Sequence, residues 1–376
     1  MFSAVIFSLT AALLSTGRSL AAEPVAGVSE KAAWEKVAAA FTPPKELAGD
    51  FGDYRSPLKF NDGREVKTPA DWSQRRAEIL ATWHGLMGAW PEVIERQKLE
   101  FLDKSDRDTF VQHTVQFKMT PEHTTRGYLL VPKKPGPHPA IVVVYYEPET
   151  GVGLNEKEHR DFALQLAKRG FVCLSMGAGA SIYYPNKERA ELQPLSANAY
   201  AAANAYQVLA GLPEVDPKRV GIVGHSYGGK WAMFASCLYD KFACAAWSDG
   251  GIVFDETRPN VNYWEPWYLG YEVGKTRERG VPKADNPRMG AYKRMIELGR
   301  DLHELHALMA PRPFLVSGGS EDPPERWKAL NHSVAVNRLL GYENRVAMTN
   351  RKMHSPTVES NEKLYAFFEH FLKPSP

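Results

Sequence analysis

A serine stands between two glycines in the segment GIVGHSYGGKWAMFAS, residues 221–236. Ser226 ends an apolar run typical of a buried strand, and Gly224 and Gly228 lie two positions before and after it. A sharp turn from strand to helix strains the central residue and brings those two positions into contact, so only glycine fits there. A serine that merely capped a helix would need neither glycine. We therefore interpret the segment as a G-x-S-x-G nucleophile turn, with the Ser226 hydroxyl raised at a helix N-terminus.

The hydroxyl of Ser226 needs partners, because serine is a weak nucleophile until a base takes its proton and an acid orients that base. After a turn of this kind the expected chain order is serine, then Asp or Glu, then histidine. His354 lies in the loop NRKMHSPT, directly after the last predicted strand, whereas His332 and His370 lie inside predicted helices. We predict that His354 is the base.

Three carboxylates compete for the role of the acid. Asp322, in LVSGGSEDPP, follows a predicted strand at the place that the chain order requires. Glu321 beside it is a close alternative, and Asp249, in AAWSDGG at the end of the preceding strand, is another. We predict Asp322 and leave both alternatives open.

An acyl-transfer intermediate also needs donors for its oxyanion. The backbone N–H of Tyr227, directly after the nucleophile, is the first expected donor. The second is expected from the loop after the strand AIVVVYY, at Tyr146 or Glu147. No HGGG segment occurs there, so we assign this donor by position alone.

The elements that must position these residues alternate along most of the chain. Six segments are predicted strands separated by helical patterns: PAIVVVYY, FVCLSMG, RVGIVGHS, ACAAWSDGG, RPFLVSGG and NRVAMTN. Two more, VQHTVQFKM and TTRGYLLVP, are joined by a turn. Such alternation predicts right-handed βαβ units. The expected fold class is α/β, with a mostly parallel central sheet and helices on both faces.

The N-terminal residues differ from this core. Residues 1–22 hold an apolar run too short to span a bilayer, followed by small residues at Ser19 and Ala21. We predict a signal peptide and export to the periplasm or beyond, with an uncleaved anchor as the alternative and no membrane span after cleavage. Residues 23–67, rich in Pro and Gly, are expected to form an irregular arm.

The predicted catalytic domain covers residues 68–376. It opens with a helix capped by Thr68, with proline at the first helical position. Between two predicted strands lies a lid-like insertion of about residues 251–312, which we expect to cover the carboxyl edge of the sheet, where ligands bind.

Composition excludes some functions. The chain has 46 Lys plus Arg against 44 Asp plus Glu, without long runs of one sign, so nucleic acid is not an expected partner. The three cysteines lie in apolar segments and are expected to be buried. The HELH segment at 303–306 lacks the histidine spacing of a zinc-binding helix, so we expect no metal and no cofactor. The oligomeric state is left open.

Taken with the turn and the acid loop, the chain resembles α/β-hydrolases over about residues 70–372. It further resembles secreted bacterial carbohydrate esterases of the glucuronoyl esterase and acetyl xylan esterase type. Gly229 and Lys230 match the Gly-Lys that follows their nucleophile turn, and LMAPRPFLVSGG is similar to the segment before their acid loop. In two places it differs: glucuronoyl esterases carry Arg where this chain has Tyr227, and Cys where it has His225.

The resemblance also bears on substrate binding. Lys230 places a cation in the first turn of a helix, against the helix dipole, and in the similar family this lysine contacts sugar hydroxyls. The aromatic segment NYWEPWYLGYE suits a sugar ring through Trp264 and Trp267, with Glu265 accepting from hydroxyls. The alternatives are a solvent-directed lysine and a hydrophobic core within the insertion.

We therefore predict a secreted serine esterase that cleaves a carboxylic ester on a small molecule or carbohydrate through an acyl-enzyme. Two other functions stay open. One is a peptidase similar to prolyl oligopeptidase, and the other is an inactive hydrolase fold that serves as a binding module.

Overall fold

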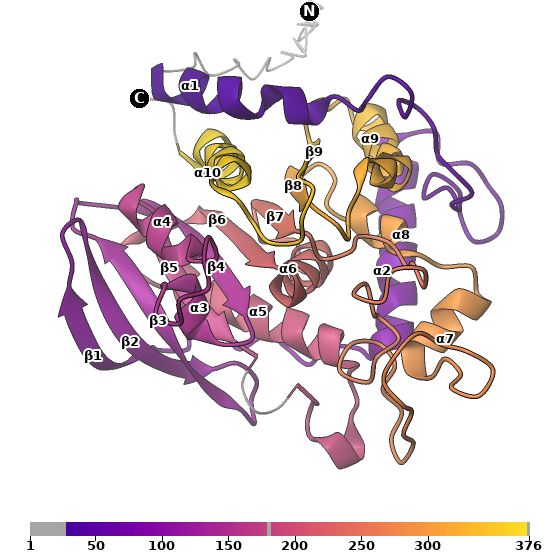
Figure 1. The fold of residues 1–376 in the computed structure, drawn as a ribbon, viewed down its shortest axis with the longest axis horizontal. Coiled ribbons are helices and arrows are strands. Elements are labelled where there is room, and N and C mark those ends of the chain that lie inside the picture. Colours follow the sequence, from indigo (N-terminus) through magenta and orange to yellow (C-terminus); the bar gives the residue numbers. More distant parts are fainter. Residues whose placement is uncertain (1–27, 179–181, 374–376) are drawn as a thin grey trace, which may run out of the picture.

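The computed structural model describes residues 28–178 and 182–373, so the predicted signal peptide at 1–22 lies outside the described residues. A nine-stranded sheet crosses the molecule in the order β1-β2-β3-β5-β4-β6-β7-β8-β9 (Figure 1). In this order, every neighbouring pair from β5 through β4 to β9 is parallel, and the pairs β1–β2, β2–β3 and β3–β5 are antiparallel. The predicted α/β class with a mostly parallel sheet is confirmed. The strands are β1 Glu100–Asp106, β2 Phe110–Lys118, β3 Thr124–Pro132, β4 His138–Tyr145, β5 Val172–Gly177, β6 Val215–His225, β7 Cys244–Ser248, β8 Phe314–Gly318 and β9 Val346–Asn350.

Helices cover both faces of this sheet. Alternate side chains of β4 enter two different hydrophobic cores: Val142 and Val144 pack on one face, and Ile141 and Val143 on the other. The first core includes α2, α5, α6, α8 and α9, and the second includes α1, α4 and α10. The helices, with short 3-10 turns (η), are α1 Val28–Val37, η1 Ala38–Phe41, α2 Pro69–Met87, α3 Pro148–Gly151, α4 Phe162–Lys168, η2 Lys187–Arg189, α5 Pro194–Ala210, α6 Tyr227–Leu238, α7 Gly290–Glu297, α8 Leu302–Ala307, η3 Pro324–Arg326, α9 Trp327–Leu339 and α10 Val358–Leu372.

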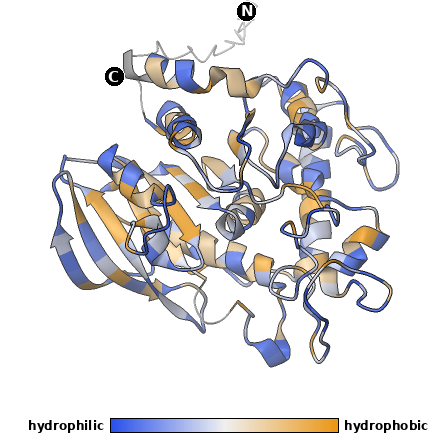
Figure 2. Cartoon of the chain, viewed as in Figure 1, coloured by the Kyte–Doolittle hydropathy of each residue, from blue (hydrophilic) through white to orange (hydrophobic). Residues whose placement is uncertain are grey.

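The edge strand β1 was not predicted from the sequence. Almost every residue of β1 is exposed, so the strand lacks the alternation of apolar and polar residues that marks a half-buried strand. Figure 2 shows the contrast between the hydrophobic central strands and the largely hydrophilic β1.

The sequence predicted an irregular N-terminal arm, but part of this arm is helical. Residues 28–37 form α1, which packs against α10 (Figure 1). Val37 is buried in the core beside α10, and Lys36 Nζ lies 3.3 Å from Glu362 Oε2. Tertiary packing therefore stabilises this helix, which we did not predict because the sequence around it is rich in Pro and Gly.

The start of α2 is as predicted. The side chain of Thr68 accepts a hydrogen bond from Asp71 N at 3.1 Å, and the Asp71 carboxylate accepts one from Thr68 N at 2.9 Å. This capping box satisfies two backbone donors of the helix. None of the helices in the described residues is long and apolar enough to cross a membrane. Cys173, Cys237 and Cys244 are buried, as expected, and free.

Candidate active site

Ser226 occupies the turn between β6 and α6 with a φ of 59° and a ψ of −114°. A Cβ atom on Gly228 would lie 2.0 Å from Val144 O, and one on Gly224 would lie 2.3 Å from Gly228 O. Both contacts are far inside van der Waals distance, so the two flanking glycines are required by close backbone approach, as the sequence predicted. Ser226 N donates to Ser248 O at 2.8 Å, which ties the strained turn to β7.

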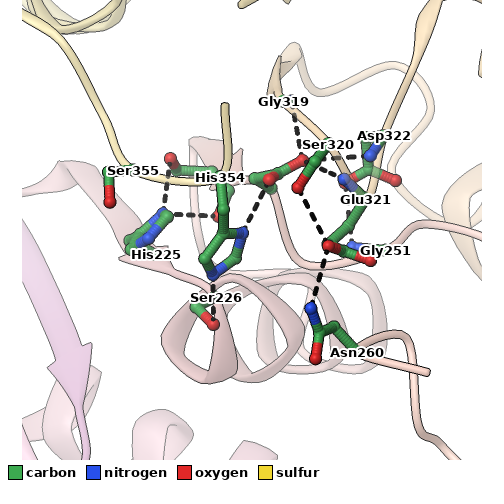
Figure 3. A network of polar contacts seen from close by, with 12 residues as sticks. His225, Ser226, Gly251, Asn260, Gly319, Ser320, Glu321, Asp322, His354 and Ser355 are labelled. Carbon is green, nitrogen blue, oxygen red and sulfur yellow. Dashed lines mark hydrogen bonds and ion pairs between the residues drawn. The ribbon is translucent and has the colours of Figure 1, made fainter. Parts of the chain in front are cut away.

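The imidazole of His354 points toward Ser226 (Figure 3), and its other ring nitrogen contacts Asp249. Its Nε2 is 2.9 Å from Ser226 Oγ, and its Nδ1 is 2.7 Å from Asp249 Oδ2. The other carboxylate oxygen, Asp249 Oδ1, accepts from three backbone amides of the loop after β8: Gly319 N at 2.6 Å, Asp322 N at 3.0 Å and Glu321 N at 3.1 Å. These bonds fix the carboxylate, and the carboxylate fixes the imidazole. The arrangement can take a proton from Ser226 and stabilise the resulting imidazolium.

The predicted partnership of Asp322 with His354 is wrong. The Asp322 carboxylate accepts instead from Gly251 N at 2.9 Å and Ile252 N at 2.6 Å, at the base of the insertion. Burial and the nearby Asp249 raise the pKa of Asp322. The side chain of Glu321 accepts from Ser320 Oγ at 2.9 Å and likewise stays away from His354.

Sheet order is the physical reason for this correction. β7 pairs directly with β6, so Asp249 at the end of β7 follows the strand next to the nucleophile. β8 pairs with β7 on its far side, which places its carboxyl end one strand spacing, about 4.8 Å, farther away. The loop after β8 reaches the site through backbone amides that hold Asp249.

Arg351 was missed from the sequence, although it precedes His354 by only three residues. Its Nη1 donates to Ser317 O at 2.7 Å, and its Nη2 donates to His354 O at 2.6 Å and Ser248 Oγ at 3.3 Å. The guanidinium thus clamps the histidine loop to the ends of β7 and β8. Burial lowers its pKa from the ordinary arginine value.

His225 is buried directly behind the imidazole of His354. The two ring centroids are 4.6 Å apart, and His225 Nδ1 is 3.1 Å from both Ser248 O and Ser248 Oγ. Burial and the neighbouring His354 lower the pKa of His225 well below its ordinary value. A neutral ring at this place packs against the base without placing a second positive charge beside it.

A cleft of about 950 Å³ opens next to this group. Four of its lining residues come from the insertion: Asn262, Trp267, Tyr268 and Arg279. The others are Thr125, Arg126, Tyr146, Glu147, Pro148, Glu149, Gly177, Ala178, Ile182, Tyr183 and Tyr227. The insertion therefore forms part of the cleft wall, beside the carboxyl ends of β4 and β5.

Aromatic rings separate the cleft from the core. The rings of Tyr146 and Tyr227 stack with centroids 4.0 Å apart, and Tyr146 remains 53% exposed. The hydroxyl of Tyr227 points inward and accepts from Asn198 Nδ2 at 2.6 Å. The backbone N–H of Tyr227, as the first residue of α6, has no acceptor within its helix, and Tyr146 and Glu147 lie beside it on the cleft.

Of the predicted substrate-binding aromatics, only Trp267 lines the cleft. Trp264 is 1% exposed, and its Nε1 donates to Glu265 Oε1 at 3.2 Å. Glu265 also accepts from Gly280 N at 2.8 Å and lies 3.5 Å from Arg277 Nη1. The substrate-binding prediction is wrong for Trp264 and Glu265, because both are used to pack the insertion.

Lys230 is also not a cleft residue. It is 3% exposed, and its Nζ donates to Gly250 O and lies 4.8 Å from the ring centroid of Tyr263. The prediction that Lys230 contacts substrate is corrected: the ammonium group holds the first residues of the insertion. Burial lowers its pKa to about 8.

The buried Lys230 predicts a pH-dependent stability. Its pKa falls from an ordinary 10.5 to about 8 on folding, so between these values the unfolded chain binds the proton more tightly. Burial of the charged Lys230 therefore destabilises the fold below about pH 8. This destabilisation decreases as the pH rises from about 8 to about 10.5. Urea denaturation of wild type and Lys230→Met across this range should show the wild type gaining stability relative to the variant. A constant difference would contradict this account.

Comparisons with known proteins agree with this architecture. Residues 125–256, from β3 to just beyond β7, match the dienelactone hydrolase family. A solved glucuronoyl esterase from Solibacter usitatus superposes with a TM-score of 0.68 at 18% identity, covering 86% of this chain and 98% of that one. The chain has the α/β-hydrolase fold. A putative acetyl xylan esterase from Bacteroides fragilis gives a TM-score of 0.55 at 14% identity and covers 81% of each chain.

One curated relative is also similar to this chain. Carbohydrate esterase MZ0003, from an unknown prokaryotic organism, is 26% identical over an alignment of 182 residues that covers 43% of this chain. The match spans 38% of that protein's length. The family match contains Ser226 and Asp249, while His354 lies beyond it.

Proposed function

We propose that this α/β-hydrolase is an exported serine carboxylesterase acting on a carbohydrate ester, with Ser226 as nucleophile, His354 as base and Asp249 as acid. The observation that carries the proposal is the continuous chain of contacts from Ser226 Oγ through His354 to Asp249, at 2.9 and 2.7 Å. The relatives named as carbohydrate esterases support the same class of substrate. Export rests on the signal-like residues 1–22 alone.

The proposed mechanism follows from the geometry. Ser226 Oγ attacks the ester carbonyl while His354 Nε2 takes its proton, and Asp249 stabilises the imidazolium. The oxyanion receives the N–H of Tyr227 and a second N–H from the loop at Tyr146 or Glu147. His354 then protonates the leaving alcohol. Water attacks the acyl-enzyme by the reverse path and releases the acid.

The side chain at position 227 bears on the acyl group. Tyrosine carries no positive charge, and the Tyr227 hydroxyl is held inward by Asn198, so this side chain offers the oxyanion neither a cation nor a hydrogen-bond donor. Stabilisation by backbone amides alone suits an ordinary carboxylic ester. We therefore do not expect the substrate to need a uronic acyl group.

A panel of esters tests the proposal. Acetylated xylan oligosaccharides, feruloyl esters and methyl glucuronoyl esters should include at least one substrate for the wild type, with turnover abolished in Ser226→Ala. A prolyl p-nitroanilide serves as the peptidase control and should not be cleaved. Failure to hydrolyse every ester, or equal hydrolysis by Ser226→Ala, would overturn the proposed function.

A further inference from the structure

Two arginines line the cleft without an acidic partner in the described residues 28–178 and 182–373. Arg126 comes from β3, and Arg279 comes from the insertion on another part of the wall. Both side chains are exposed. The Arg279 guanidinium lies 5.6 Å from the ring centroid of Trp267, so a flat aromatic surface and a cation stand together in the cleft.

The two acidic residues of the cleft contact groups other than these arginines. Glu147 lies 2.8 Å from Lys157 Nζ and is neutralised by it. Glu149 Oε1 accepts from Tyr128 OH at 3.1 Å. The two arginines and two glutamates that line the cleft balance in formal charge, but within the described residues neither glutamate forms an ion pair with an arginine, so both guanidinium groups are left to bind a carboxylate of a ligand.

We propose that this cleft binds a carboxylate group on the substrate, so that the enzyme prefers acidic carbohydrate esters over neutral ones. Guanidinium groups bind carboxylates through charge-assisted hydrogen bonds, and a carbohydrate ring bearing that carboxylate can pack on Trp267. This inference rests on the proposed esterase function and adds the charge of the substrate to it.

The carboxylate can belong to either part of the ester, and matched substrates distinguish the two cases. For the alcohol part, the O-acetyl ester of methyl glucuronoside with a free carboxylate is compared with its uronamide. For the acyl part, 4-nitrophenyl hydrogen adipate is compared with 4-nitrophenyl hexanoate. Each pair differs mainly in one negative charge, so the ratio of kcat/KM within a pair measures the preference for that charge.

The wild type should favour the anionic member of at least one pair by about tenfold, since exposed ion pairs are screened and individually modest. Arg279→Gln and Arg126→Gln should each reduce this ratio at least about threefold, while hydrolysis of the neutral member stays within about twofold. Arg279→Lys should keep part of the preference. Arg107→Gln is the matched control, because Arg107 is an exposed arginine that lines a different groove. Added salt should weaken the preference.

Two outcomes overturn the inference: an anionic-to-neutral ratio near one for both pairs, or a preference that both arginine variants and the control retain equally. Failure of the esterase proposal gives a different result, namely no Ser226-dependent turnover of any ester. In that case calorimetric titration decides the inference separately. Methyl glucuronoside should bind the Ser226→Ala protein more tightly than methyl glucoside, and Arg279→Gln in that background should remove the difference. Equal binding of both sugars would overturn it.

Discussion

Asp249→Asn should lower kcat by about four orders of magnitude, whereas Asp322→Asn and Glu321→Gln should stay within about tenfold of the wild type. The side-chain amide of the Asp249→Asn variant could donate a hydrogen bond to His354 Nδ1 and so favour the imidazole tautomer with its proton on Nε2. That tautomer cannot accept the proton of Ser226. The effect is large because the interaction of Asp249 with the imidazolium grows as the serine is deprotonated.

The three variants are matched controls for one another. Asp249, Asp322 and Glu321 lie in one polar network, but only Asp249 contacts His354. Asp322 also accepts hydrogen bonds from the backbone of Gly251 and Ile252, so its replacement can lower the stability of the fold. Thermal unfolding of each variant therefore shows whether a loss of turnover comes from a loss of stability. If folded Asp322→Asn lost as much turnover as Asp249→Asn, the assignment of the acid would be contradicted.

Most of the parallel sheet could be predicted because its strands are buried on both faces. Val142, Val143 and Val144 belong to a continuous apolar run, and helices follow it and separate the later strands, so this pattern can be recognised without knowledge of tertiary contacts. β1 could not be predicted, since an exposed edge strand carries no hydrophobic pattern. α1 owes its stability to α10, which lies more than three hundred residues later in the sequence.

The nucleophile and the base could be predicted because each depends on local sequence. Gly224 and Gly228 mark the turn, and His354 is the histidine in the loop after the last strand. The choice of the acid depends instead on which strand lies beside β6, and both Asp249 and Asp322 lie between Ser226 and His354 in the chain. Pairing of β7 with β6 decides between them.

Substrate-binding residues were the least predictable part of the site. Lys230 and Trp264 have suitable chemistry, yet both are buried within the protein, where they hold the insertion. A cluster of aromatic residues has the same sequence pattern whether it lines a cleft or fills a core. Arg351 was missed because nothing in the local sequence shows that its guanidinium joins the histidine loop to the ends of β7 and β8.

Ser226→Ala should lower kcat for any ester substrate by about six orders of magnitude. The variant retains the two flanking glycines, so the turn and the stability of the fold should be preserved. Replacing His354 by Ala should cost nearly as much, because nucleophile and base act as one unit and their effects do not add.

Covalent labelling with an active-site phosphonate tests the central claim most directly, since it requires an activated serine and no knowledge of the natural substrate. Intact mass and peptide mapping should show one adduct per chain, located at Ser226, that forms rapidly in the wild type. Labelling should be absent in Ser226→Ala and slowed strongly in His354→Ala and Asp249→Asn. An adduct at another residue, or labelling that persists in Ser226→Ala, would contradict the account.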